Sequence, residues 1–361
     1  MIAKDRNYGI DLLRIGSMFM IVLLHILGAG GMLTATSSHV SFNRLLWLIE
    51  IACYCAVNCY AIVSGYVGYK QKFKFTNIIV LWLQVFFYTF LINLVFWIAG
   101  WQELSFSSLK SAFLPVMNGE YWYFTAYFVM YMFIPILNSV LEKFNKKQVG
   151  VMLTIGFVLF SLFPTILMND PFMLGAGYSC WWLTYLYLLG GYINKYNIFN
   201  NSSVFNYLVY YICSVLFTFL SKINFEFLTM KIFGEVRYGM MFINYVSPTI
   251  LFCAICLVIG FSKMKFNNFF AKLISFFAPL SFSVYLIHNN RLLLNKFWVN
   301  SFVYLTEYSV FKMIGSIFII AFGVYLICSL IDYIRFLLFK LFKVKEAILK
   351  LENKYFKDLL N

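Results

Sequence analysis

The sequence predicts an all-α integral membrane protein with about ten transmembrane helices. Of its 361 residues, 62% are hydrophobic and only 12% are charged, and the mean hydropathy is +0.81. A soluble domain needs a charged shell that this composition cannot supply. The apolar runs are long and continuous, which favours helices over the short alternating segments of a membrane β-barrel. At about 20 residues for each span, ten spans leave space for short loops and a tail.

Ten apolar runs define the predicted spans. Their limits are 10–28, 46–67, 77–99, 121–141, 149–168, 180–194, 204–222, 241–262, 272–290 and 310–337. We assign 1–339 to one transmembrane domain. In 340–361, apolar residues alternate with lysines, which predicts an amphipathic cytoplasmic helix on the surface of the inner leaflet.

The distribution of Lys and Arg predicts that both termini lie in the cytoplasm. Nineteen of the 28 lysines and arginines fall in segments on the same side as the N-terminus, eight fall on the other side, and Arg14 alone lies inside a span. This bias follows the positive-inside rule. We therefore attribute the net charge of +14 to topology and to contact with the anionic lipid bilayer, and we expect no nucleic-acid partner.

The eight cysteines all lie in apolar runs. Cys253 and Cys256 form a single CxxC on a hydrophobic helix, and no second pair accompanies them. A zinc site needs about four ligands in a tetrahedral arrangement. We therefore expect buried, unreactive thiols and no metal site.

The first predicted span carries three ionisable residues, Asp11, Arg14 and His25. Ionisable groups within a membrane are costly, so each is a candidate for function. Asp11 and Arg14 can pair because residues three apart share a helix face. Arg14 and His25 are 11 residues apart, which is close to three full turns and about 16 Å along the axis. Arg14 should then lie near the cytoplasm, and His25 toward the outer leaflet.

This spacing suits a long substrate with an anionic head and a reactive far end, such as acyl-coenzyme A. Its diphosphate would pair with the guanidinium of Arg14, and its thioester would reach His25. A neutral imidazole at His25 would act as general base on an acceptor hydroxyl, or as a nucleophile that forms an acyl-histidine. The alternative is structural: Asp11 and Arg14 form only an interfacial ion pair, and His25 bonds to a neighbouring helix.

Further polar and aromatic residues are expected in the outer half of the membrane, at the depth of His25. Glu120 is a candidate for a catalytic carboxylate beside His25, whereas we interpret Glu50 as topological and expect no specific role for His39. Aromatic rings there can stack on a sugar, or else form the aromatic belt of the lipid interface, and His288 alternatively makes a helix-end hydrogen bond. The predicted substrate-binding residues are Tyr121, Trp122, Tyr123, Tyr127, His288 and Arg291.

A basic loop follows the second predicted span and contains Lys70, Lys72 and Lys74. These lysines are candidates for binding the 3′-phosphate of coenzyme A. A positive-inside signal alone also explains them.

Four stretches, in order along the chain, resemble the acyltransferase-3 family of membrane acyltransferases, which modify bacterial surface polysaccharides and related glycans. The first span resembles the family's Arg-x10-His signature with its preceding Asp. The others resemble a Ser-Gly-aromatic stretch before a basic loop, a Tyr-Trp-Phe…Tyr…Pro-x-Leu-Asn span, and a late Tyr-Leu-Ile-His element. The stretches are Ile10 to His25, Val63 to Tyr66, Tyr121 to Tyr127 with Pro135 to Asn138, and Ser283 to His288.

The resemblance implies a ten-helix acyltransferase that takes cytosolic acyl-CoA, usually acetyl-CoA, and in which Arg14 and His25 are essential. The chain departs from the family pattern in two places. Lysines stand in the basic loop where typical members carry arginines, and many members carry a proline near the position of Asn58. Both departures concern the binding of coenzyme A.

We therefore expect a multi-pass O-acyltransferase of the bacterial plasma membrane. It would move an acetyl group from acetyl-CoA to a hydroxyl of a cell-surface or lipid-linked glycan, without a metal. One alternative keeps the fold and changes the donor to succinyl-CoA. Another is a glycan or lipid transporter that uses Arg14 and His25 as a substrate or proton site, which the lack of an internal sequence repeat disfavours.

Overall fold

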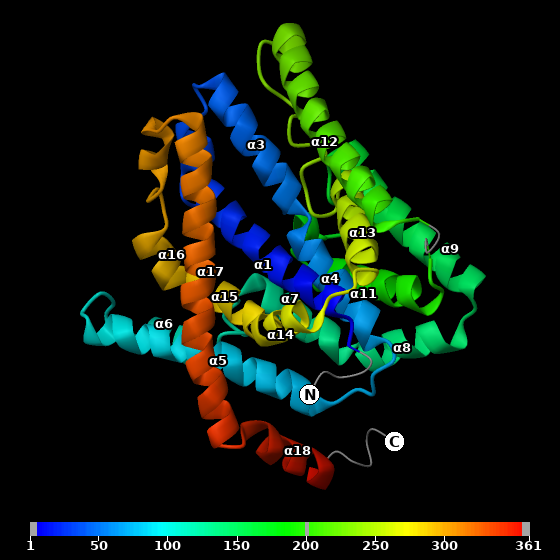
Figure 1. Ribbon diagram of the computed structural model, residues 1–361, viewed down its shortest axis with the longest axis vertical. Coiled ribbons are helices and arrows are strands. Elements are labelled where there is room, and N and C mark those ends of the chain that lie inside the picture. The colour runs from blue at the N-terminus through cyan, green and yellow to red at the C-terminus, as the bar shows by residue number, and fades with distance from the viewer. Residues whose placement is uncertain (1–5, 199–201, 356–361) are drawn as a thin grey trace.

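The computed structural model describes residues 6–198 and 202–355, and the regular elements in these ranges are helices (Figure 1). The first part contains α1 (Tyr8–Leu27), α2 (Met32–Ala35), α3 (Val40–Tyr54), α4 (Ala56–Gly68), α5 (Phe75–Ile98), α6 (Phe106–Phe113), α7 (Trp122–Met132), α8 (Ile134–Lys143) and α9 (Lys146–Phe157). The second part contains η1 (Val158–Leu162), α10 (Phe163–Leu167), η2 (Gly175–Gly177), α11 (Cys180–Lys195), α12 (Val204–Phe233), α13 (Pro248–Ser262), α14 (Asn268–Phe277), η3 (Ala278–Leu280), α15 (Ser281–His288), α16 (Arg291–Phe297), η4 (Val303–Glu307), α17 (Val310–Leu341) and α18 (Val344–Tyr355).

Each of the ten predicted spans coincides with a helix or with a broken helix. Within the described residues, seven helical stretches are long and apolar enough to cross a membrane, and the bent pair α7 and α8 adds an eighth if it counts as one span. The remaining two predicted spans correspond to α11 and α13, with 16 and 15 residues. A multi-pass helical membrane protein is thus confirmed, whereas the count of ten and the orientation of the termini stay predictions.

Helix α1 runs through the middle of the molecule and contacts α3, α4, α13, α14, α15 and α17 (Figure 1). Asn7 caps its start, because the Asn7 side chain accepts a hydrogen bond from the Ile10 amide at 3.1 Å and donates one to the Ser262 carbonyl at 2.8 Å. Gly9 permits the close approach to α13: a Cβ there would lie 1.8 Å from the carbonyl oxygen of Phe261. The span with the three ionisable residues Asp11, Arg14 and His25 is therefore the one that other helices surround.

Helices α4 and α11 cross at two glycines. A Cβ on Gly65 would lie 1.9 Å from the Tyr187 carbonyl oxygen, and one on Gly190 would lie 2.0 Å from that of Ile62. Small residues at such crossings let membrane helices pack backbone against backbone. Gly65 belongs to the Ser-Gly-Tyr stretch that the sequence singled out, so the structure gives that glycine a packing role.

Two spans are broken at prolines. Helices α7 and α8 meet at a 55° bend, where Pro135 lies in the first turn of α8. Helices α14 and α15 are separated by η3, which contains Pro279. Proline has no amide hydrogen to donate to the preceding turn, so it ends or bends a helix. Helix α15 packs on α1, and its last residue, His288, lies within hydrogen-bond distance of His25.

Helix α17 contains a buried ion pair that a tyrosine of α5 joins by a hydrogen bond. The Arg335 guanidinium donates two hydrogen bonds of 2.8 Å to Asp332, and the Tyr88 hydroxyl donates a third at 2.7 Å. Helix α18 then returns to α5, where the Glu352 carboxylate accepts hydrogen bonds from the amides of Phe75 and Thr76 at 2.8 and 3.0 Å. The described part of the predicted tail is thus held on the N-terminus of α5; residues 356–361 of that prediction lie outside the described residues.

Candidate active site

Arg14 lines a cavity of about 260 Å³. All three predicted lysines are exposed; Lys72 lines the same cavity, whereas Lys70 and Lys74 lie outside its wall. The cavity therefore combines two cationic side chains that lie 58 positions apart in the sequence. Its wall is formed by Arg14, Ser64, Val67, Gly68, Gln71, Lys72, Phe73, Asn77, Ile78, Leu81, Tyr127, Tyr131, Ile134 and Tyr187.

Asp11 positions Arg14. One carboxylate oxygen of Asp11 lies 3.0 Å from the Arg14 guanidinium, and the other lies 2.5 Å from Nε of Arg6. Asp11 is buried and lines neither the Arg14 cavity nor the His25 cavity described next. Because an ion pair on one edge fixes a guanidinium plane, Asp11 acts on the cavity through Arg14. The predicted pairing of Asp11 with Arg14 is present.

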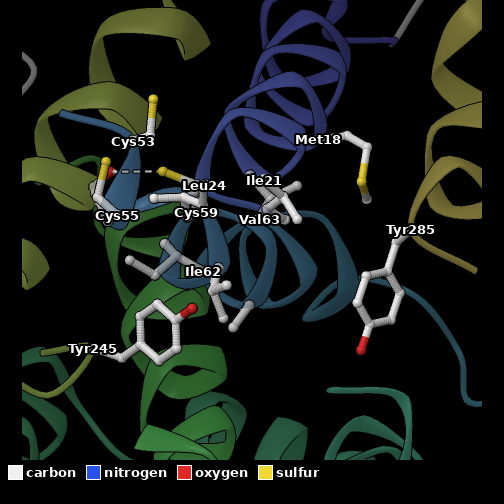
Figure 2. Packing of buried hydrophobic residues seen from close by; sticks show 14 of the residues in the cluster. Met18, Ile21, Leu24, Cys53, Cys55, Cys59, Ile62, Val63, Tyr245 and Tyr285 are labelled. Atoms are coloured by element: carbon white, nitrogen blue, oxygen red, sulfur yellow. Dashed lines mark hydrogen bonds between the residues drawn. The ribbon is translucent and has the colours of Figure 1, made fainter. Parts of the chain in front are cut away.

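His25 lines a second cavity, of about 200 Å³. Figure 2 shows part of its wall, with Met18, Ile21 and Leu24 of α1 near Tyr285 and Tyr245. The full wall is formed by Met18, Ile21, Leu24, His25, Gly28, Ala29, Glu50, Tyr54, Val57, Tyr60, Trp122, Tyr123, Tyr178, Tyr245, Phe282 and Tyr285.

The two cavities adjoin along the same three helices. Helix α4 gives Tyr60 to the His25 cavity and Ser64 to the Arg14 cavity, and α7 gives Tyr123 and Tyr127 in the same way. Each pair is one helical turn, about 5.4 Å, apart. The rings of Tyr123 and Tyr127 are stacked, with centroids 6.2 Å apart. Arg14 and His25 thus face neighbouring cavities on one side of α1, as their spacing predicted.

His25 is paired with His288. The Nδ1 atom of His25 lies 2.8 Å from Nε2 of His288, and Nδ1 of His288 lies 2.5 Å from the Val284 carbonyl oxygen. A carbonyl oxygen only accepts, so Nδ1 of His288 carries a hydrogen. In a neutral His288, Nε2 then accepts the hydrogen on Nδ1 of His25. The basic lone pair of His25 is therefore on Nε2, which is the arrangement that a general base or nucleophile requires.

Two predicted substrate-binding residues, Tyr121 and His288, lie behind the His25 cavity and outside its wall. The Tyr121 hydroxyl donates to the Leu286 carbonyl at 2.7 Å and accepts from the Asn290 amide at 2.9 Å. Tyr121 thus ties the start of α7 to the end of α15, and so supports the helix that carries His288.

Glu120 and Arg291 also lie outside the wall of the His25 cavity. Glu120 accepts a hydrogen bond from the Ser111 hydroxyl at 3.4 Å. Burial raises the pKa of the Glu120 carboxyl, and the positive charge of Arg291 opposes that rise. The predicted carboxylate beside His25 is therefore not Glu120: the side chain that hydrogen-bonds His25 is His288.

The structure brings Glu50 into the His25 cavity, where the sequence had suggested only a topological role. Tyr54, Tyr178 and Tyr245 join it there, although no motif marked them. The carbonyl of Tyr245 accepts a hydrogen bond from Asn58 at 2.8 Å. Asn58 thus positions Tyr245, which is part of the cavity wall. An acidic residue early in an apolar span was the signal that could have identified Glu50.

One of three comparisons with known proteins identifies a family. The family model of an acyltransferase domain, acyltransferase-3, matches residues 7–333, which contain both cavities and the His25–His288 pair. No curated protein and no solved structure matches the chain. A match over nearly the whole chain, with Arg14 and His25 on one side of a central helix, leads to one conclusion: the protein belongs to the acyltransferase-3 family and is a membrane acyltransferase.

Proposed function

We propose that this acyltransferase moves an acetyl group from cytosolic acetyl-CoA to a hydroxyl of a lipid-linked or cell-surface glycan at the bacterial plasma membrane. The observation that supports the proposal most is the adjoining pair of cavities, one with the cations Arg14 and Lys72 and one with the paired His25. Only a long donor, with an anionic head and a reactive end, uses both. The family match favours this enzyme over the transporter alternative.

The donor would bind with its phosphates at Arg14 and Lys72. A guanidinium and an ammonium are the side chains that recognise phosphate oxygens best. The pantetheine arm would run from the Arg14 cavity to the His25 cavity along α4 and α7, beside the rings of Tyr60 and Tyr123, which meet edge to face with centroids 6.4 Å apart. This path leads from the Arg14 cavity to the wall that contains His25, so the thioester would arrive at the basic nitrogen.

His25 would then activate the transfer. In the general-base route, Nε2 takes the proton of the acceptor hydroxyl while its oxygen attacks the thioester carbonyl. The carbon–sulfur bond breaks, the ester forms, and the thiolate recovers the proton from His25, so that coenzyme A leaves as a free thiol. In the nucleophilic route, Nε2 attacks first, the carbon–sulfur bond breaks and the thiolate leaves. The acceptor oxygen then attacks the acyl carbon, the carbon–nitrogen bond to Nε2 breaks, and the hydroxyl proton goes to the thiolate or, once the thiolate has left, to solvent. His288 keeps Nδ1 of His25 hydrogen-bonded in both routes.

The acceptor would meet the thioester in the His25 cavity. Trp122 and Tyr123, two of the predicted sugar-binding residues, line it. Their rings are apolar bodies with a polar edge, which suits the alternating C–H and O–H surfaces of a sugar. Tyr127 lines the donor cavity instead, and we assign it to the pantetheine path.

The proposal is tested with the full-length protein in lipid nanodiscs, acetyl-CoA labelled in the acetyl group, and a membrane-glycan fraction from the source cells as acceptor. We expect labelled, alkali-labile ester on the glycan. His25→Ala should abolish it, and the matched control His39→Ala, on an exposed histidine, should not. Transfer from succinyl-CoA but not from acetyl-CoA would show that the donor is succinyl-CoA. Failure of both thioesters to yield labelled glycan would overturn the function.

The same preparation distinguishes the two chemical routes. Without acceptor, the nucleophilic route leaves the acetyl label covalently on the protein and releases one equivalent of coenzyme A. The general-base route leaves the protein unlabelled. His25→Ala should remove any covalent label, because the acyl group would be attached to Nε2.

A further inference from the structure

Glu50 is the acidic member of the His25 cavity, and its carboxyl lacks an internal partner. The side chain is buried, with 8% of the residue exposed, and its Oε2 atom makes no hydrogen bond to a described residue. None of the ion pairs between described residues includes it. A buried carboxyl is costly unless it is paired or hydrogen-bonded. What occupies the cavity must therefore supply the missing hydrogen bonds.

Aromatic rings surround this carboxyl. Tyr54 follows Glu50 by one helical turn, and its ring centroid lies 4.9 Å from that of Tyr245. The centroids of Tyr178 and Tyr245 are 5.1 Å apart, and those of Trp122 and Tyr178 are 4.3 Å apart. All of these residues line the cavity with Glu50. The wall is thus a continuous set of rings that includes one carboxyl group.

A second polar group in the cavity is also unpartnered. The hydroxyl of Tyr123 is buried and makes no hydrogen bond to a described residue. Glu50 and Tyr123 come from different helices, α3 and α7, and line the same cavity. The buried hydroxyls of Tyr60 and Tyr285, which line the same cavity, also make no hydrogen bond to a described residue. Four such groups in one cavity indicate a ligand that offers several hydrogen bonds and also has an apolar surface. An acyl chain alone offers too few hydrogen bonds, and the cations that suit the phosphates of the donor, Arg14 and Lys72, line the other cavity.

A sugar ring satisfies both requirements. Its hydroxyls donate to a carboxylate, and the C–H face of the ring packs on aromatic side chains. We propose that Glu50 binds hydroxyls of the acceptor sugar, within a subsite formed by the rings of Tyr54, Trp122, Tyr178 and Tyr245, and so selects the acceptor that meets His25. This inference rests on the proposed function, and it assigns the acceptor a binding site separate from the Arg14 and Lys72 cavity of the donor.

The test separates the acceptor from the donor. Glu50→Gln keeps the shape of the side chain and replaces its carboxyl group by an amide, and Glu50→Asp keeps the carboxyl group on a shorter stem. Glu103, exposed in the loop after α5, provides the matched control Glu103→Gln. The full-length proteins are expressed in source cells that lack their own copy of the gene. Alkali-released acetate is then measured on the cell-surface glycans, and the Kd for acetyl-CoA is measured on each purified protein.

We expect Glu50→Gln to lower glycan acetylation about tenfold, the factor expected when a buried hydrogen bond is lost. Its Kd for acetyl-CoA should stay at the wild-type value, which also shows that the protein folds. Glu50→Asp should fall between Glu50→Gln and the wild type, and it serves as the test if the Gln variant does not accumulate. Glu103→Gln should match the wild type in both measurements.

Two results would overturn the inference. One is wild-type glycan acetylation by the folded Glu50 variants while His25→Ala is inactive. That result would leave the proposed function intact and would mean that Glu50 binds only water and no acceptor sugar. The other is a loss of acetyl-CoA binding in the Glu50 variants equal to the loss of acetylation, which would place Glu50 on the donor side. By contrast, a wild-type protein that neither binds acetyl-CoA nor acetylates glycan would refute the proposed function itself.

Discussion

The Nδ1 atom of His25 lies 2.8 Å from Nε2 of His288, although 263 residues separate the two in the sequence. The second imidazole has the place that a carboxylate has in many hydrolase triads, where it fixes the tautomer of the catalytic histidine. A neutral imidazole does the same without adding a charge to the membrane interior. The Val284 carbonyl oxygen accepts a hydrogen bond from Nδ1 of His288 and so fixes the tautomer of His288. The pair therefore provides orientation at a low cost of charge burial.

Replacement of His288 should slow the reaction without weakening the binding of acetyl-CoA. His288→Ala leaves Nδ1 of His25 without its acceptor, so we expect kcat to fall about 100-fold, within the range that positioned acid–base groups contribute. His288→Gln should recover part of the loss, because the side-chain oxygen of Gln can accept from Nδ1 of His25. The KM for acetyl-CoA should stay unchanged in both variants. A rise in KM with an unchanged kcat would instead make His288 a substrate-binding residue, as the sequence suggested.

The basic loop should contribute to donor binding chiefly through Lys72. Because Lys72 lines the Arg14 cavity and Lys70 and Lys74 do not, Lys72→Ala should raise the KM for acetyl-CoA about tenfold, as loss of one charge-assisted hydrogen bond does. Alanine at either neighbouring lysine should have a smaller effect. Lys143→Ala, on an exposed lysine at the end of α8, is the control. Equal effects of all four substitutions would indicate a diffuse surface charge and no phosphate site.

The crossing of α4 and α11 should tolerate no side chain. Gly65→Ala places a methyl group where a Cβ lies 1.9 Å from a backbone oxygen, so the helices must separate. We expect a loss of about 1–3 kcal/mol in the free energy of unfolding, as for other overpacked interiors, seen as a lower unfolding temperature of the full-length protein in detergent. Gly323→Ala meets open space and should not destabilise. Equal stability of the two variants would contradict the packing described here.

Much of this site was predictable from periodicity, and the rest depended on packing between distant segments. The 11-residue spacing of Arg14 and His25 placed both on one side of α1, because helix geometry converts that spacing into a shared face. The partner of His25 could not be derived in that way. His288 reaches it because α15 starts anew after Pro279 and then packs on α1, and no local pattern encodes that contact.

The fold was predictable for a similar reason, since the solvent of a membrane helix imposes a length and a composition that can be read from sequence. The bend between α7 and α8 and the short α13, which begins at Pro248 and not at 241, were not, because both depend on where a proline ends or bends a helix. Glu50 was assigned to topology since an acidic residue early in a span has no sequence feature that shows which cavity it lines. The aromatic wall around it is assembled from α3, α7 and two loops.

The most direct test of the account is a kinetic comparison of Arg14→Ala with His25→Ala in the full-length enzyme, with acetyl-CoA as the varied substrate. Arg14→Ala should raise the KM and the Kd for acetyl-CoA about tenfold or more, because a charged phosphate contact is lost, and should leave most of kcat. His25→Ala should keep the wild-type Kd and lose transfer. A His25→Ala enzyme that acetylates glycan at the wild-type rate would contradict the central claim that His25 performs the transfer.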